Sequence, residues 1–173
     1  VITWRNLPPP PTGHDDNDQP VMVDVYEWDG KWNRVLRQSI GSVKAINNLS
    51  DYAYQDFSIS LQDDFFAILT TSVSESWITR QCRLYIFTKN PLKKGVWIAN
   101  PLITLSESAI SGEVVSGKDF VAVRFSEVFG SEVSDYLTVV NKDYLTWSIL
   151  PNYNKKYLGK FAFPIGNFVD KFL

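Results

Sequence analysis

The sequence predicts an all-β domain, and three observations lead to this class. Apolar and polar residues alternate with a period of two in several short stretches, for example at residues 21–25 and 121–125. The dipeptide Asp29-Gly30 stands between two tryptophans, an arrangement typical of a tight β-hairpin turn. No segment keeps the apolar spacing of an amphipathic helix over three turns, so the 173 residues are expected to form strands joined by turns.

The first 20 residues differ in composition from the rest of the chain. Four consecutive prolines at residues 8–11 favour an extended polyproline II segment, and residues 12–18 are polar and rich in turn formers. We therefore expect an exposed arm or linker over residues 1–20. Residues 21–173 are expected to form one β domain, since their number suits a single globular unit.

Each expected strand is a short alternating or apolar stretch bounded by polar turn residues. In chain order, these strands lie at residues 21–26, 57–61, 65–69, 84–87, 121–125 and 136–140. Their lengths and spacing match short antiparallel strands that return through turns.

Two recurring phrases indicate an internal repeat with a period near 50 residues. The first phrase is an acidic or amide residue, then Phe, then a small apolar strand. Its copies begin at Asp64, Asp119 and Asn167. The second phrase is an apolar strand, a polar turn and a strand that contains Trp. Its copies end at Trp32, Trp97 and Trp147, and the two phrases alternate along the chain.

If this repeat is real, residues at the same place in each copy share one environment. Phe65, Phe120 and Phe168 are then equivalent, and so are the three tryptophans, with each side chain buried against the next unit. About four short strands per unit match the blade of a β-propeller, whose faces are covered by neighbouring blades. The prediction is therefore a partial β-propeller of short antiparallel strands, and the alternative is a two-sheet β-sandwich.

The order of these phrases resembles the FG-GAP-type repeats of integrin-α-like β-propellers, particularly their bacterial relatives. Residues 57–68 and then residues 84–97 reproduce the order of strand, Asp, small apolar strand and Trp hairpin, and residues 111–125 follow it more loosely. The resemblance covers about residues 21–173 and implies a β-propeller fold. The Phe-Gly and Gly-Ala-Pro motifs and the Asp-x-Asp-x-Asp-Gly calcium loop of that family are missing, so its metal sites are not carried over.

The number of repeat units predicts a partner. About three units are present, whereas a closed propeller needs at least four blades. An incomplete set of blades leaves an open face of apolar strand residues, and such faces bind other chains. We therefore expect contact with another polypeptide or with the remainder of a longer parent chain.

Composition excludes several classes of function. The formal net charge is −2, from 17 basic and 19 acidic residues, so the chain lacks the positive field of a nucleic-acid-binding domain. The single cysteine, Cys82, and the single histidine, His14, argue against a disulfide framework and a zinc site. No apolar run approaches 18 residues, so no membrane insertion is expected. We expect neither a metal nor another cofactor.

No catalytic motif has the spacing that its chemistry requires. Residues 112–119 fit the pattern G-x-x-x-x-G-K, but Asp119 stands where a phosphate-binding loop needs Ser or Thr, and an alternating strand follows instead of a helix. A hairpin turn at residues 117–119 is the favoured interpretation. Asp63 and Asp64 are adjacent and point to opposite faces of a strand, which leaves open only a carboxylate pair formed by distant residues.

Trp77 is the side chain that the sequence singles out for binding. It lies in the polar stretch of residues 70–81 between two expected strands, whereas the tryptophans of the repeat are explained as core residues, Trp28 among them. The resulting hypothesis is a non-enzymatic protein-interaction module in a secreted or surface assembly such as an adhesin or toxin, with a cytoplasmic location as the alternative. A glycan-binding or glycan-hydrolysing β protein is the second hypothesis.

Overall fold

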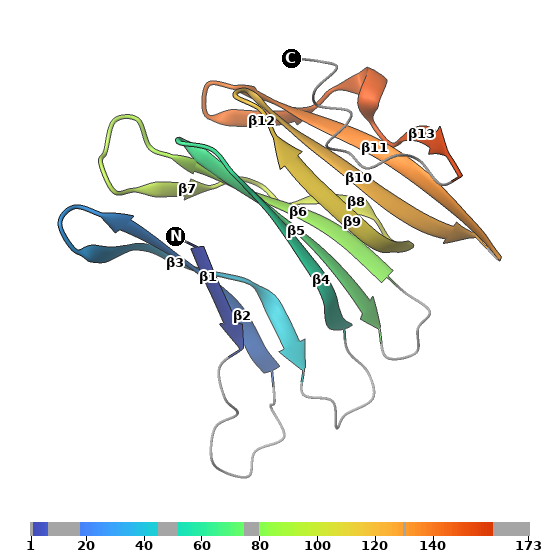
Figure 1. Cartoon of the computed structure of the whole chain (residues 1–173), viewed down its shortest axis with the longest axis horizontal. Coiled ribbons are helices and arrows are strands. Elements are labelled where there is room, and N and C mark those ends of the chain that lie inside the picture. The colour runs from blue at the N-terminus through green and yellow to red at the C-terminus, as the bar shows by residue number, and fades with distance from the viewer. Residues whose placement is uncertain (1, 7–17, 45–51, 75–79, 130, 161–173) are drawn as a thin grey trace, which may run out of the picture.

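The computed structural model describes residues 2–6, 18–44, 52–74, 80–129 and 131–160 (Figure 1). In these residues the chain is all-β, as the sequence predicts, with thirteen strands and one 3₁₀ turn. Every strand pairing in the described residues is antiparallel. Strands that follow one another along the chain are mostly neighbours in a sheet, as is usual where short turns join them.

The strands form three sheets in chain order. Sheet A consists of β1 (Ile2–Asn6), β2 (Asp18–Trp28) and β3 (Trp32–Lys44). Sheet B consists of β4 (Tyr52–Leu61), β5 (Phe65–Ser74), β6 (Arg80–Lys89) and β7 (Trp97–Ala99), with β8 (Ile103–Ser106) also paired to β6. Sheet C consists of β9 (Ala109–Ser116), β10 (Phe120–Phe129), β11 (Glu132–Asp143) and β12 (Thr146–Ile149), with β13 (Lys156–Gly159) also paired to β11. The 3₁₀ turn, η1 (Pro151–Tyr153), lies between β12 and β13.

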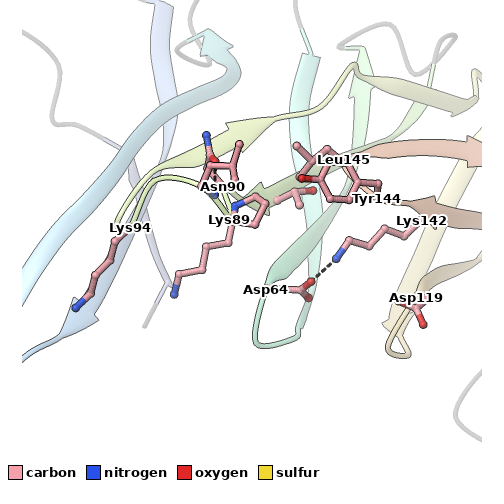
Figure 2. Close-up of a pocket in the computed structure, with 11 residues that line it drawn as sticks. Asp64, Lys89, Asn90, Lys94, Asp119, Lys142, Tyr144 and Leu145 are labelled. Carbon is pink, nitrogen blue, oxygen red and sulfur yellow. Dashed lines mark hydrogen bonds and ion pairs between the residues drawn. The ribbon is translucent and has the colours of Figure 1, made fainter.

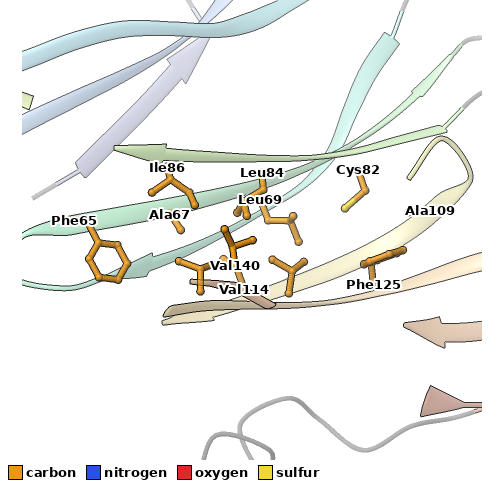
Figure 3. Close-up of a cluster of buried hydrophobic side chains, with 12 residues drawn as sticks. Phe65, Ala67, Leu69, Cys82, Leu84, Ile86, Ala109, Val114, Phe125 and Val140 are labelled. Atoms are coloured by element: carbon orange, nitrogen blue, oxygen red, sulfur yellow. The ribbon is translucent and has the colours of Figure 1, made fainter. Parts of the chain in front are cut away.

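The three sheets are stacked face to face, with sheet B in the middle (Figure 1). One buried cluster lies between sheets A and B. Its members are Val23, Val25, Ile40, Phe66, Ile68 and Phe87. A larger buried cluster lies between sheets B and C (Figure 3). Its members include Phe65, Ala67, Leu69, Leu84, Val121, Val123 and Phe125.

Alternation along β5 explains how one strand contributes to both clusters. Phe65, Ala67 and Leu69 belong to the cluster with sheet C, whereas Phe66 and Ile68 belong to the cluster with sheet A. All five side chains are at most 1% exposed. Because successive side chains of a strand point to opposite faces, an uninterrupted apolar run is typical of a strand that is covered on both sides.

Sheets B and C repeat the same pairing pattern. In both, four strands follow in chain order across the sheet, and a fifth short strand returns to the third. The register also repeats. Phe65 pairs with Thr88 in sheet B, and Phe120 pairs with Asn141 in sheet C. Lys89 pairs with Trp97 in sheet B, and Lys142 pairs with Trp147 in sheet C. The recurring phrases of the sequence therefore correspond to equivalent strands in these two sheets.

How deeply the equivalent residues are buried depends on whether a neighbouring sheet covers the face on which they lie. Phe65 is fully buried, and Trp97 and Trp147 are partly buried. Phe120 is only partly buried, because it lies on the face of sheet C that points away from sheet B. Trp32 is 56% exposed, so the prediction that it is buried as deeply as the other two tryptophans is wrong. No other described sheet covers the side of sheet A on which it lies.

Three further expectations concern the ends and one turn. Ile2–Asn6, within the range expected to be an arm, pairs with β2 as an edge strand, which satisfies backbone groups of both segments. Residues 117–119 form the expected hairpin turn between β9 and β10, where the Gly117 N–H donates to the Phe120 carbonyl at 3.0 Å. Phe168 lies outside the described residues.

Candidate functional site

One end of the sheet stack gathers five turns, and we call it the hairpin end. The turns follow β2, β4, β6, β9 and β11, at residues 29–31, 62–64, 90–96, 117–119 and 144–145. Ion pairs from Lys89 to sheet A and from Lys142 to sheet B link the three sheets at this end. The hairpin end is therefore the place where turns from all three sheets meet.

A cleft of about 690 Å³ opens at the hairpin end between sheets B and C (Figure 2). Its lining comes from four of the turns and the adjoining strand ends, and eight of the eleven lining residues have a polar or charged side chain. The lining includes Asp64, Thr88, Lys89, Asn90, Lys94, Asp119, Lys142 and Tyr144. Because both signs of charge are present, the cleft suits a mixed polar surface better than a purely anionic ligand.

Two of the lysines in the cleft are held in ion pairs. Lys89 Nζ lies 2.8 Å from Glu27 Oε1 of sheet A. Lys142 Nζ pairs with the carboxylate of Asp64, which belongs to the turn before β5. The Lys142 side chain is only 10% exposed, whereas the Asp64 side chain is 55% exposed, so the cation is shielded from water and the carboxylate is not. Both lysines therefore connect neighbouring sheets.

Two other charged side chains of the cleft have no ion pair within the part of the chain that the structure describes. Lys94 and Asp119 are both exposed. Figure 2 shows them on opposite sides of the Asp64–Lys142 pair. Lys94 and Asp119 therefore add one exposed positive and one exposed negative charge to the lining of the cleft.

Sheets B and C meet at this end through Trp147, and we call this junction the Trp147 contact. The indole N–H of Trp147 donates to Thr88 Oγ1 at 2.9 Å. The Trp147 ring meets the Phe65 ring edge-on, with ring centres 4.7 Å apart. Lys142 Nζ lies 5.3 Å from the centre of the same Phe65 ring. Lys142 is therefore both ion-paired and placed over an aromatic ring, and these contacts connect sheet C to sheet B.

Exposed apolar side chains also gather at the hairpin end. The large ones are Trp28, Trp32, Leu61, Leu92 and Tyr144, with exposed fractions from 56% to 87%. Trp28 and Trp32 were both expected in the core, and this expectation is wrong, because no described element packs on their side of sheet A. Their rings meet edge-on with centres 5.3 Å apart. Apolar side chains exposed together among charges are typical of an interaction surface.

The sequence alone does not reveal this cleft, because its residues lie far apart in the chain. Asp64 and Asp119 stand out only as repeat positions. Lys89 and Lys142 carried a signal that could have been read, since each follows the same apolar strand in its copy of the repeat. Trp77, the residue predicted to bind, lies outside the described residues, so its role stays a prediction.

The buried ionisable groups lie away from the cleft. Cys82 is fully buried, and burial, together with the charge of Glu127, raises the pKa of its thiol to about 12, so the thiol stays protonated at neutral pH. Glu127 is itself buried, accepts a hydrogen bond from the Ser106 hydroxyl and lies 2.8 Å from Lys155 Nζ. Across the described ranges, no three His, Cys, Asp or Glu side chains lie close enough to hold a metal ion.

Neither a membrane-spanning helix nor a match to a known protein accompanies this site among the residues described. Among the residues described, no helix has the length and apolar character that crossing a membrane requires. Comparison of the chain with protein-family models, with curated proteins and with solved structures finds no match. The geometry of the hairpin end and of the sheet faces is therefore the basis for assigning a function.

Proposed function

We propose that this chain is a non-catalytic protein-interaction module, built from consecutive blades of a β-propeller and belonging to a larger secreted or surface assembly of the adhesin or toxin kind. The observation that carries the proposal is the hairpin end, where turns of three sheets bring exposed apolar side chains and unpaired charges onto one surface. The partner is a polypeptide.

The propeller architecture is supported by the repeated register of sheets B and C. Successive blades require equivalent sheets that cover each other's faces, with large aromatic residues in the space between them. Phe65 and Trp147 lie in that position between sheets B and C, and Phe66 and Trp97, 5.2 Å apart, lie next to sheet A. A two-sheet sandwich is the alternative, and it accounts for only two of the three stacked sheets.

Binding of a polypeptide is supported by the residues that the turns expose. Leu92 is 87% exposed and Tyr144 is 69% exposed, and both line the cleft with the unpaired Lys94 and Asp119. Apolar anchors surrounded by charges of both signs match the core and rim of protein–protein interfaces. A nucleic acid would instead require a positive surface, which a formal net charge of −2 does not favour.

A glycan-binding or glycan-hydrolysing protein is the second candidate, and one observation favours it. Trp28 and Trp32 are neighbouring exposed indoles, and aromatic rings of this kind supply apolar contact area to ligands. Their planes are inclined by 63°, so the two rings do not form one flat platform. The interaction module therefore stays the first proposal.

A glycan array combined with a panel of glycosidase substrates distinguishes the two candidates. The proteins are the wild type and the double variant Trp28→Ser/Trp32→Ser, whose substitutions fall on exposed positions. We expect neither saturable glycan binding nor substrate turnover from either protein. Turnover, or saturable binding by the wild type that the double variant loses, would overturn the proposal and favour the glycan candidate.

A further inference from the structure

The Trp147 contact shows which residues of sheet B and sheet C touch where the two sheets stack. On sheet B, Phe65 receives the Trp147 ring and Thr88 receives its indole N–H. Asp64, at the rim, receives Lys142, which lies directly opposite Trp147 on the neighbouring strand. The cross-strand pair of Lys142 and Trp147 on sheet C thus contacts three residues on sheet B, and we call the positions of these three the receiving positions.

The outer face of sheet C has the same receiving positions. Tyr153 of η1 and Leu158 of β13 also pack on this face, against Ala122 and Leu137, and no described sheet is stacked on it. By register, Phe120, Asn141 and Asp119 correspond to Phe65, Thr88 and Asp64. The apolar surface around Phe120 includes Val115 and Val139, which are also only partly buried. Asp119 has no ion pair among the described residues. This face therefore resembles the face of sheet B that sheet C covers.

The outer face of sheet A carries the matching pair. Trp28 and Trp32 lie directly opposite each other on β2 and β3, as Lys142 and Trp147 do on β11 and β12. Val25 points into the cluster with sheet B, so the alternation along β2 directs Trp28 to the opposite, outer face. Both indoles are more than half exposed and are open to a partner.

We infer that the outer face of sheet A in one copy docks onto the outer face of sheet C in a second copy of this chain, with Trp32 against Phe120. The inference rests on the proposed stacking of blades and names the partner of the open faces. The occupant is a second copy because the chain itself carries both halves of the contact. Lys31, beside Trp32 in the β2–β3 turn, supplies a cation for Asp119. Since the two faces differ, the contact is head-to-tail and leads to chains or rings of copies.

Sedimentation velocity with face-blocked variants tests this docking. Phe120→Asp places a charge on the apolar face of sheet C, and Trp28→Ser/Trp32→Ser removes the aromatic pair from sheet A. Leu102→Ser is the matched control, because Leu102 is 46% exposed and lies in the β7–β8 connection of sheet B, outside both faces. Circular dichroism melts establish that each variant folds.

The wild type and Leu102→Ser are expected to gain mass as concentration rises. Each face-blocked variant alone is expected to stay at the monomer mass of 19.8 kDa. An equimolar mixture of the two face-blocked variants is expected to form dimers and to stop there. Each variant keeps one intact face, and that face fits the intact face of the other.

Three outcomes would overturn the inference: a wild type that stays monomeric, face-blocked variants that associate as the wild type does, or a mixture that stays monomeric. If Phe120→Asp does not melt cooperatively, Val139→Lys blocks the same face. The glycan experiment does not depend on self-association, so a failure of this docking is distinguishable from a failure of the proposed function.

Discussion

Gly112 of β9 lies against Leu69 and Cys82 of sheet B, so its replacement by alanine tests the stacking of sheets B and C. A Cβ atom at this position would lie 2.5 Å from Leu69 Cδ2, with the Arg124 carbonyl oxygen at 3.4 Å and Cys82 Sγ at 3.6 Å. Carbon atoms in contact prefer separations of about 3.5–4.0 Å, so the methyl group lacks about 1 Å of space. Leu69 is 1% exposed inside the cluster, so the methyl must displace a packed side chain or push β9 away.

The expected cost of Gly112→Ala is about 1–3 kcal/mol of the free energy of unfolding, as is usual for overpacking a core. In open space, replacing a strand glycine by alanine would instead raise stability by about 0.5–1 kcal/mol, because glycine loses more conformational freedom on folding. The sign of the measured change therefore separates a crowded position from an open one.

Urea denaturation of four proteins measures the contact directly. They are the wild type, Gly112→Ala, Leu69→Ala and the double variant. Leu69→Ala alone is expected to cost about 2–5 kcal/mol. In the Leu69→Ala background the new methyl group enters the cavity left by Leu69, so Gly112→Ala is expected to be neutral or stabilising. The expected coupling free energy between the two substitutions is therefore about 1–3 kcal/mol. Ser111→Ala, at the exposed neighbouring position, is the control and should change stability by less than about 0.5 kcal/mol.

Two results would refute this reasoning. In the first, Gly112→Ala is as stable as the wild type or more stable. In the second, the two substitutions add without coupling, so that Gly112 and Leu69 are not in contact. Either result would mean that β9 does not lie on sheet B as closely as described.

Four other predictions use the same denaturation and melting measurements. Phe65→Ala should lower the free energy of unfolding by about 3–5 kcal/mol, and Phe120→Ala should lower it clearly less, because Phe65 is fully buried and Phe120 is only partly buried. Equal losses would contradict the assignment of Phe120 to the outer face of sheet C. Addition of EDTA should leave the melting temperature unchanged, and a large fall would reveal a metal. The pKa of Cys82 is raised from 9.0 to about 12, so between these pH values the unfolded chain loses the thiol proton and the folded chain keeps it. The free energy of unfolding should then fall with rising pH by up to about 1.4 kcal/mol per pH unit from this group, and Cys82→Ala should lack that part of the slope. Lys155→Met leaves Glu127 buried without its cation and should lower the free energy of unfolding by about 3 kcal/mol at neutral pH. This value is the lower end for a broken buried pair, because Lys155 is 43% exposed. A loss below about 0.5 kcal/mol would show that the pair does not stabilise the fold.

Local sequence patterns determine the class of this fold and several of its turns. The alternation at residues 57–61 and 121–125 predicts segments that lie within β4 and β10. The Asp29-Gly30 dipeptide predicts the β2–β3 turn, where Gly30 has a φ of +93° that side-chain-bearing residues rarely adopt. These predictions succeed because strand alternation and turn formation depend on residues that are close in sequence.

The repeat is also readable from the sequence, because equivalent strands keep equivalent residues. The Asp-Phe phrases at Phe65 and Phe120 predict positions that have the same register in sheets B and C. What the phrases do not predict is the burial of each copy. Trp32 and Trp147 end the same phrase, yet the first is more than half exposed and the second is partly buried against Phe65.

Only the tertiary structure decides which faces are covered and which charges meet. Asp64 and Lys142 are 78 residues apart, and Thr88 and Trp147 are 59 residues apart. No local pattern encodes such pairs, since they form only when whole sheets stack in a given order. Burial depends on the neighbouring sheet and not on the residue itself, so a tryptophan at one repeat position is packed in sheet C and exposed in sheet A, where no described sheet lies beside it.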